Sequence, residues 1–149
     1  MHTITKEFRF EAAHIIDGHP GKCANLHGHS YISTVEFSGP VSTDTGMVID
    51  YYEVSKLCDP IFETLDHSFL TSVKPGEVAE TLEGCITNEV LKKGCKVTSL
   101  GRVTTAENLA RFLHESVTEE LTRQYPNFAV KCTRVTVKET VKTSASYGG

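Results

Sequence analysis

Two long segments, residues 4–14 and 29–39, alternate between apolar and polar side chains. Such alternation predicts β-strands with one buried face, and these strands constrain the fold more than any other feature. Residues 15–28 between them are punctuated by glycine and proline, which predicts a loop and an antiparallel strand pair. The expected inward positions are Ile4, Phe8, Phe10 and Ala12 in the first strand and Tyr31, Ser33, Val35 and Phe37 in the second.

Residues 48–67 have helical periodicity. Asp50 is a suitable N-cap and Glu53 lies three residues later, as in a capping box. Pro60 is expected to kink or split this helix, with Asp59 capping the second piece. The expected apolar stripe is Val54, Leu57, Ile61 and Leu65.

A stronger helical pattern covers residues 104–125, where Thr104 and Glu107 fit a capping box. A weaker pattern at 77–94 predicts another helix that ends near Gly94. Its expected stripe is Val78, Leu82, Cys85, Ile86 and Val90.

The remaining segments complete an α+β pattern. Residues 129–140 are expected to form a third long strand, residues 143–147 the start of a fourth, and residues 95–100 a short strand. The order strand-strand-helix-helix-strand-strand predicts an antiparallel four-stranded sheet with two main helices on one face. A length of 149 residues fits a single domain, residues 1–149.

Charge and cysteine usage narrow the class of protein. The net charge of -4 argues against nucleic acid as the main partner, because phosphate binding favours a basic face. We expect no secretory signal and no membrane span, since no apolar run approaches ~18 residues. The 5 cysteines are irregularly spaced and lack a C-x-x-C pair, so we expect reduced thiols in the cytoplasm.

A metal site is the first chemical hypothesis. His27 and His29 are two residues apart, so on a strand both imidazoles point to one face. His14 ends the neighbouring strand and is the natural third ligand. Three imidazoles favour zinc over magnesium or calcium and leave one position open for water or substrate. The alternative is a surface pair of histidines without a metal.

Cys23 lies four residues before His27 in the loop. It is a candidate fourth zinc ligand, or a thiolate base or nucleophile whose pKa is lowered near a metal and histidines. The third alternative is a loop cysteine without a role.

Two further places carry carboxylates. Asp66 and His67 form a candidate proton relay if a loop brings them into contact, although a histidine that stabilises a helix C-terminus explains the pair as well. Glu139 has the parity of the inward residues of its strand, so its carboxylate needs a partner such as the NH/NH₂ edge of a ligand, or a salt bridge. The capping box accounts for Glu107.

Six blocks occur in order over nearly the whole chain: "FRFEAAH", "CANLHGHSY", "GMVIDYYEVSKL", "LDHSFL", "TTAENLARFL" and "VTVKET". Together they resemble the 6-pyruvoyltetrahydropterin synthase superfamily. The C-x3-H-G-H spacing resembles its bacterial 6-carboxy-5,6,7,8-tetrahydropterin synthase branch, whereas the pyruvoyl branch has C-x5-H-G-H. Two extra residues would move the thiol by several ångströms, at ~3.3 Å per extended residue.

The resemblance implies a tunnelling fold whose subunits form an oligomeric barrel, commonly a homohexamer of two trimers. It also implies zinc, a pterin triphosphate substrate and an early step of queuosine or 7-deazaguanine synthesis. Residues 71–102 are longer than the family pattern and predict an insertion. The matching positions are His14, His27 and His29 for zinc, Cys23 as catalytic thiol, His67 with Asp66 as relay, Glu139 as pterin anchor and catalytic residue, and Glu107 near the pterin pocket.

The implied reaction is zinc-dependent conversion of 7,8-dihydroneopterin triphosphate to 6-carboxy-5,6,7,8-tetrahydropterin, with release of acetaldehyde and triphosphate. One alternative is a lyase of the 6-pyruvoyltetrahydropterin synthase type, which differs in its product. The other is a non-catalytic zinc- or pterin-binding module, which would need neither the thiol nor the relay.

Overall fold

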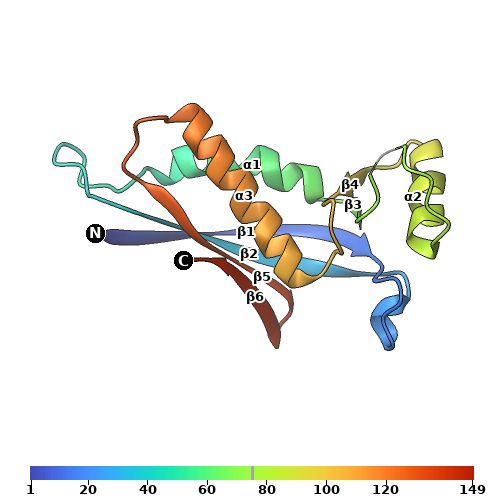
Figure 1. The fold of residues 1–149 in the computed structure, drawn as a ribbon. Coiled ribbons are helices and arrows are strands. Elements are labelled where there is room, and N and C mark those ends of the chain that lie inside the picture. The colour runs from blue at the N-terminus through green and yellow to red at the C-terminus, as the bar shows by residue number, and fades with distance from the viewer. Residues whose placement is uncertain (75) are drawn as a thin grey trace.

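A computed structural model describes residues 1–74 and 76–149. It contains a six-stranded sheet with the order β4-β3-β1-β2-β5-β6, and two helices, α1 and α3, lie on one face of that sheet (Figure 1). A third helix, α2, lies beside β3 and β4 at one end. The elements are β1 His2–His14, a 3-10 turn Lys22–Ala24, β2 His27–Gly39, α1 Tyr51–Leu65, β3 Ser68–Thr71, α2 Leu82–Lys92, β4 Val97–Ser99, α3 Ala106–Gln124, β5 Lys131–Thr140 and β6 Thr143–Gly148.

The central antiparallel pair is confirmed. Strands β1 and β2 pair without interruption from His2 opposite Gly39 to His14 opposite His27. All the expected inward residues are buried except Ile4, which is half-buried against the core. Strand β5 pairs antiparallel with β2, and β6 with β5, as expected from the order of segments.

The expected sheet of four antiparallel strands is nevertheless incomplete, because two more strands make it a mixed sheet. Strand β3 pairs parallel with β1, and β4 pairs parallel with β3. Helix α1 follows β2 and returns the chain along the sheet, so β3 runs opposite to β2 and parallel to β1. Helix α2 then forms the crossover that makes β4 parallel to β3. All four residues of β3 are buried, so no alternation marks it in the sequence.

Helix α1 is one continuous helix, so the expected split at Pro60, with Asp59 as a second cap, is wrong. Pro60 lies on the exposed side, where water can solvate the carbonyl that loses its partner. On the other side Phe62 stacks on Phe8 with ring centroids 4.4 Å apart, and this packing holds the helix together. Asp50 is the N-cap as predicted, with its side chain accepting from Tyr52 N.

Helix α3 begins one residue later than predicted. Thr105 is the N-cap, and its side chain accepts from Asn108 N. Thr104 is buried and its hydroxyl donates to the Ile15 carbonyl (3.4 Å). Asn108 therefore occupies the capping-box position, so the capping explanation of Glu107 is wrong and its carboxylate is free for another role.

Helix α2 is shorter than predicted and buries a different face. It ends before Gly94, whose φ of 75° is the left-handed conformation expected after a helix. Val78, Leu82 and Cys85 of the expected stripe are exposed. The buried residues of α2 are Glu83, Gly84 and Thr87. Residue 75, within the predicted insertion 71–102, lies outside the described residues.

Glu83 ties α2 to the sheet although it is a buried carboxylate, 6% exposed. One carboxylate oxygen, Oε1, accepts from the Thr71 hydroxyl (3.0 Å) and from Ser72 N (2.5 Å). The other, Oε2, accepts from the Ser72 hydroxyl (2.8 Å). Three donors thus replace the water that the carboxylate loses on burial.

Replacing Glu83 with alanine should lower the free energy of unfolding by about 3 kcal/mol, because three donors lose a charged acceptor. Urea denaturation measures this loss. The control is Glu89→Ala, which removes an exposed ion pair with Lys92 and should cost below about 1 kcal/mol. Equal losses in the two variants would contradict an anchoring role for Glu83.

None of the helices in the described part of the chain combines the length and apolar character needed to cross a bilayer.

Candidate functional site

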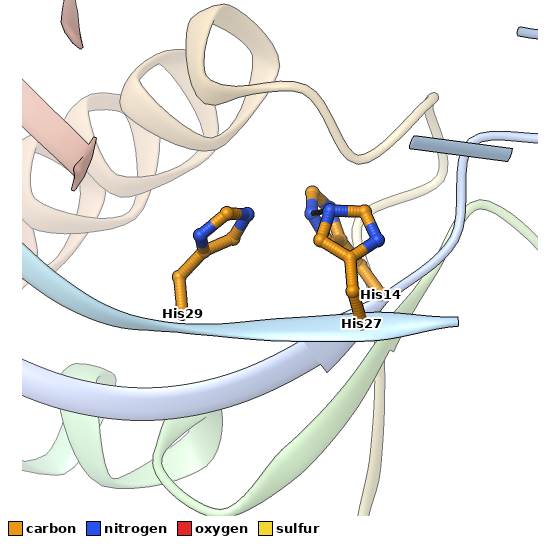
Figure 2. A group of neighbouring side chains, drawn as sticks. All are labelled: His14, His27 and His29. Atoms are coloured by element: carbon orange, nitrogen blue, oxygen red, sulfur yellow. Dashed lines mark hydrogen bonds between the residues drawn. The ribbon is translucent and has the colours of Figure 1, made fainter. Parts of the chain in front are cut away.

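The pairing of β1 with β2 brings three imidazoles together. His14 lies directly opposite His27, and His29 follows two residues later on β2. Figure 2 shows the three rings on the same side of the two strands. Their ligand nitrogens all lie within 4.8 Å of one another. The structure therefore groups the three histidines that the sequence singles out as metal ligands.

Backbone carbonyls orient two of the rings. His14 donates from Nδ1 to the Thr104 carbonyl (2.7 Å), and His27 donates from Nδ1 to the Asn25 carbonyl (2.7 Å). Each ring then presents the lone pair of Nε2, and the two Nε2 atoms are 3.0 Å apart. Lone pairs this close repel unless a cation lies between them. A tetrahedral zinc with Zn–N of ~2.0–2.1 Å would separate them by about 3.3 Å, so the arrangement fits a metal with little adjustment.

Two of the histidines, His14 and His29, have the protonation state that a metal requires. Burial lowers the pKa of His14 to about 4, and the neighbouring His27 and His29 act in the same direction, against the Thr104 carbonyl. Burial also lowers the pKa of His29, with His27 as the second cause. Both rings are therefore neutral at pH 7, which is the form that binds a metal ion.

Cys23 lies in the 3-10 turn of the loop between β1 and β2 and is half-buried. Its carbonyl accepts from Ile16 N (2.9 Å), which closes the loop. Within residues 1–74 and 76–149, the cluster of potential metal ligands contains the three histidines and no thiol. The geometry thus favours a three-ligand site with an open position over a closed site that includes Cys23.

Two carboxylates share a pocket of about 260 Å³ near the histidines. Glu139 comes from β5 and Glu107 from the first turn of α3. Burial raises the pKa of Glu139, the Glu107 carboxylate raises it further, and His27 and Tyr31 oppose the shift. A pair of carboxylates in a small pocket is suited to a ligand that offers several N–H donors.

Tyr31 was expected only as a core residue, and its hydroxyl is an additional feature of the site. That hydroxyl is buried and has no hydrogen-bond partner among the described residues. Burial raises the pKa of Tyr31, and the nearby Glu139 carboxylate adds to the shift. The signal in the sequence is a tyrosine on the strand face that carries the two β2 histidines.

Asp66 and His67 are in contact, as a relay requires. His67 donates from Nδ1 to Oδ2 of Asp66 (2.8 Å), and Oδ1 of Asp66 accepts from Glu11 N (2.8 Å). Adjacent side chains meet here because His67 has a left-handed backbone, with φ of 54°. The Glu11 N–H and then His67 lower the pKa of Asp66, so the carboxylate remains ionised.

The relay pair and the histidine cluster face opposite sides of the sheet. His67 lines a pocket of about 490 Å³ together with Glu11 and Ser30, and His29 also borders this pocket. Glu11 and Ser30 are exposed and alternate along their strands with the inward residues, so their side chains point away from the face that carries the His14 and His29 rings. A single chain therefore presents two parts of the predicted site on two faces.

Comparisons with known proteins show which family has this sequence and fold. Residues 3–149 match the family model of 6-pyruvoyl tetrahydropterin synthase. The chain is 37% identical over 120 residues to 6-carboxy-5,6,7,8-tetrahydropterin synthase of Haemophilus influenzae, which covers 76% of this chain and 79% of the relative. It is 29% identical to the enzyme of the same name from Aquifex aeolicus, over 97% and 96% of the two chains. The solved 6-pyruvoyl tetrahydropterin synthase of Caenorhabditis elegans aligns with a TM-score of 0.71 at 25% identity, over 99% of this chain and 95% of that one.

Proposed function

The chain belongs to the 6-pyruvoyl tetrahydropterin synthase family, and from that premise we propose that it is a 6-carboxy-5,6,7,8-tetrahydropterin synthase. It would convert 7,8-dihydroneopterin triphosphate and water to 6-carboxy-5,6,7,8-tetrahydropterin, acetaldehyde and triphosphate. The observation that carries the proposal is a three-histidine cluster with an open position next to a pocket lined by two carboxylates. The names of the relatives and the C-x3-H-G-H spacing support the carboxy product.

Zinc is the proposed metal, held by His14, His27 and His29. Three imidazoles, two of them oriented by backbone carbonyls, suit zinc better than magnesium or calcium. When bound, zinc would make the side-chain hydroxyls of the substrate more acidic. The open fourth position leaves room for those hydroxyls.

The carboxylate pocket is the proposed pterin site. Glu139 would accept two parallel hydrogen bonds from the NH/NH₂ edge of the ring, and Glu107 would lie close to the same ring. A desolvated carboxylate gains more from such donors than one in water, because water no longer competes for it.

Replacing Glu139 with glutamine should weaken the binding of 7,8-dihydroneopterin about 10- to 100-fold. A hydrogen bond to a charged acceptor contributes about 1.5–3 kcal/mol, and about 1.4 kcal/mol is tenfold in affinity. Isothermal titration calorimetry measures the change. Glu119→Gln, on the exposed side of α3, should bind like the unaltered protein. Unchanged affinity in the Glu139 variant would remove Glu139 from the pterin site.

The proton transfers are assigned to Cys23 and to His67 with Asp66. The Cys23 thiolate would move a proton at the substrate side chain, and His67 would relay another with Asp66 as its acceptor. Since Asp66 and His67 lie on the opposite face of the sheet, we propose that a neighbouring copy of the chain supplies them to each site. A site shared between copies of the chain supports a homo-oligomer, and we propose the homohexamer of two trimers.

We further propose that the enzyme works in the cytoplasm in queuosine synthesis.

The proposed function is tested by mass spectrometry of the products formed from 7,8-dihydroneopterin triphosphate by the zinc-loaded protein. Acetaldehyde together with 6-carboxy-5,6,7,8-tetrahydropterin is the expected result. A 6-pyruvoyl product would retain the family chemistry and overturn the carboxy assignment. Binding of zinc and pterin without turnover would overturn the enzymatic proposal.

A further inference from the structure

Side chains from the β4 region hydrogen-bond to the carbonyls at the C-terminal end of α1, next to Asp66 and His67. The last carbonyls of a helix lack partners within the helix. Here Lys96 donates from Nζ to the Asp66 carbonyl (2.8 Å) and to the Glu63 carbonyl. Thr98 in β4 donates from its hydroxyl to the Thr64 carbonyl (2.5 Å). Three carbonyls around the relay pair are thus bound from one short segment.

This segment is itself fixed to the sheet. Strand β4 pairs parallel with β3, and the carbonyl of Lys96 accepts from Phe69 N (3.0 Å). The Thr98 hydroxyl also accepts from the Ser68 hydroxyl (2.8 Å). Lys96, directly before β4, and Thr98 within it are therefore both hydrogen-bonded to β3, which favours accurate placement of the groups that they bind.

The relay pair needs such support, because its backbone is strained. His67 has φ of 54°, and a left-handed conformation costs a residue with a side chain roughly 1–2 kcal/mol. On one side Glu11 of β1 holds the pair, since His67 N donates to the Glu11 carbonyl (2.6 Å) and Glu11 N donates to Asp66. The side chain of His67 is 78% exposed, so packing adds little. Lys96 is the anchor on the other side of Asp66.

We propose that Lys96 is a positioning residue for the Asp66–His67 pair, an inference that rests on the relay role proposed above. By fixing the backbone of Asp66, Lys96 keeps the carboxylate on Nδ1 of His67. The proton then stays on Nδ1, and the lone pair of Nε2 faces outward as the base. Residues 71–102, the predicted insertion, thereby contribute to the active site through β4.

The test compares Lys96→Met, which keeps the length of the side chain and removes its donors, with Lys96→Arg and with the control Lys92→Met. Lys92 is exposed on α2 and pairs with Glu89. Lys96→Met should lower kcat about 10- to 100-fold with KM within about twofold, because a misplacement of about 1 Å can cost 10²-fold. Lys96→Arg should restore most of the rate, and Lys92→Met should match the unaltered enzyme. A kcat of Lys96→Met within twofold of the control would overturn the proposal.

A second measurement tests the positioning role of Lys96 without turnover. Absence of turnover in the unaltered protein would overturn the proposed function but would not bear on this inference. Imidazole ¹⁵N shifts report which ring nitrogen of His67 carries the proton. The unaltered protein should show the Nδ1–H tautomer, and Lys96→Met should move toward Nε2–H, which free imidazole side chains prefer. An unchanged tautomer would overturn the positioning role. Should Lys96→Met fail to fold, Lys96→Gln takes its place, because its shorter side chain cannot reach both the Glu63 and the Asp66 carbonyls. It should produce the same loss of kcat and the same change of tautomer, and the absence of both would overturn the proposal.

Discussion

A Cys23→Ala enzyme should lose about 10²- to 10⁴-fold in kcat and keep its zinc. The loss is the usual contribution of a positioned acid or base, which is the role proposed for the thiol. The metal should remain because the cluster of ligands in the described residues contains three histidines and no thiol. Steady-state kinetics gives the rate, and metal analysis by mass spectrometry gives the zinc content per chain.

The matched control is Cys85→Ala, since Cys85 is an exposed thiol on α2 away from the cluster. Its kcat and zinc content should equal those of the unaltered enzyme. Full activity in the Cys23 variant would end the proposed mechanism, whichever pterin is the product. Loss of zinc together with activity would instead make Cys23 a ligand, contrary to the three-histidine geometry.

His27→Ala should abolish turnover at limiting zinc and weaken zinc binding by more than about 100-fold. Substitution of residues that only support a metal ligand already costs 10- to 100-fold in affinity, so removing a ligand should cost more. The variant also leaves His14 without the nitrogen that faces it at 3.0 Å. Competition with a chromophoric chelator measures the affinity.

For this second variant the control is His2→Ala, an exposed histidine at the start of β1. It should bind zinc and turn over substrate normally. Unchanged zinc affinity in His27→Ala would show that the three rings do not form the metal site.

The central part of the fold is predictable because β1 and β2 are long, half-buried strands. Each alternates over many residues, and the same parity that selects Phe10 and Tyr31 for the core also selects His14 and His29. The metal cluster therefore follows from the alternation together with the pairing of the two strands. Strand β3 is not predictable in this way, because four fully buried residues carry no periodicity.

Helix ends are less predictable, and here an error of one residue changes the interpretation of the site. Thr104 and Thr105 are both acceptable N-caps by sequence, and the burial of Thr104 against Ile15 decides between them. With the cap at Thr105, Glu107 is no longer needed for capping, and its carboxylate lines the same pocket as Glu139. A tertiary contact made 89 residues away in sequence thus determines which carboxylates share a pocket.

Secondary-structure propensities do not predict the contact between Asp66 and His67, since neighbouring residues in regular structure do not face each other. It depends on the left-handed backbone of His67 and on bonds to β1 and the β4 region. The face of the sheet on which the Asp66–His67 pair lies is not predictable either. The register of β1 with β3 determines that face, and no local pattern in the sequence predicts the register.

The left-handed backbone of His67 implies a conflict between durability and activity at one position. Glycine has no Cβ and accepts this conformation freely, so His67→Gly would relieve the strain in the folded chain. Selection for thermal robustness alone would therefore replace the imidazole, and only selection for turnover retains it. Engineering that raises the melting temperature of this enzyme by consensus or computational ranking should hold residue 67 fixed, because such methods reward the substitution that removes its chemistry.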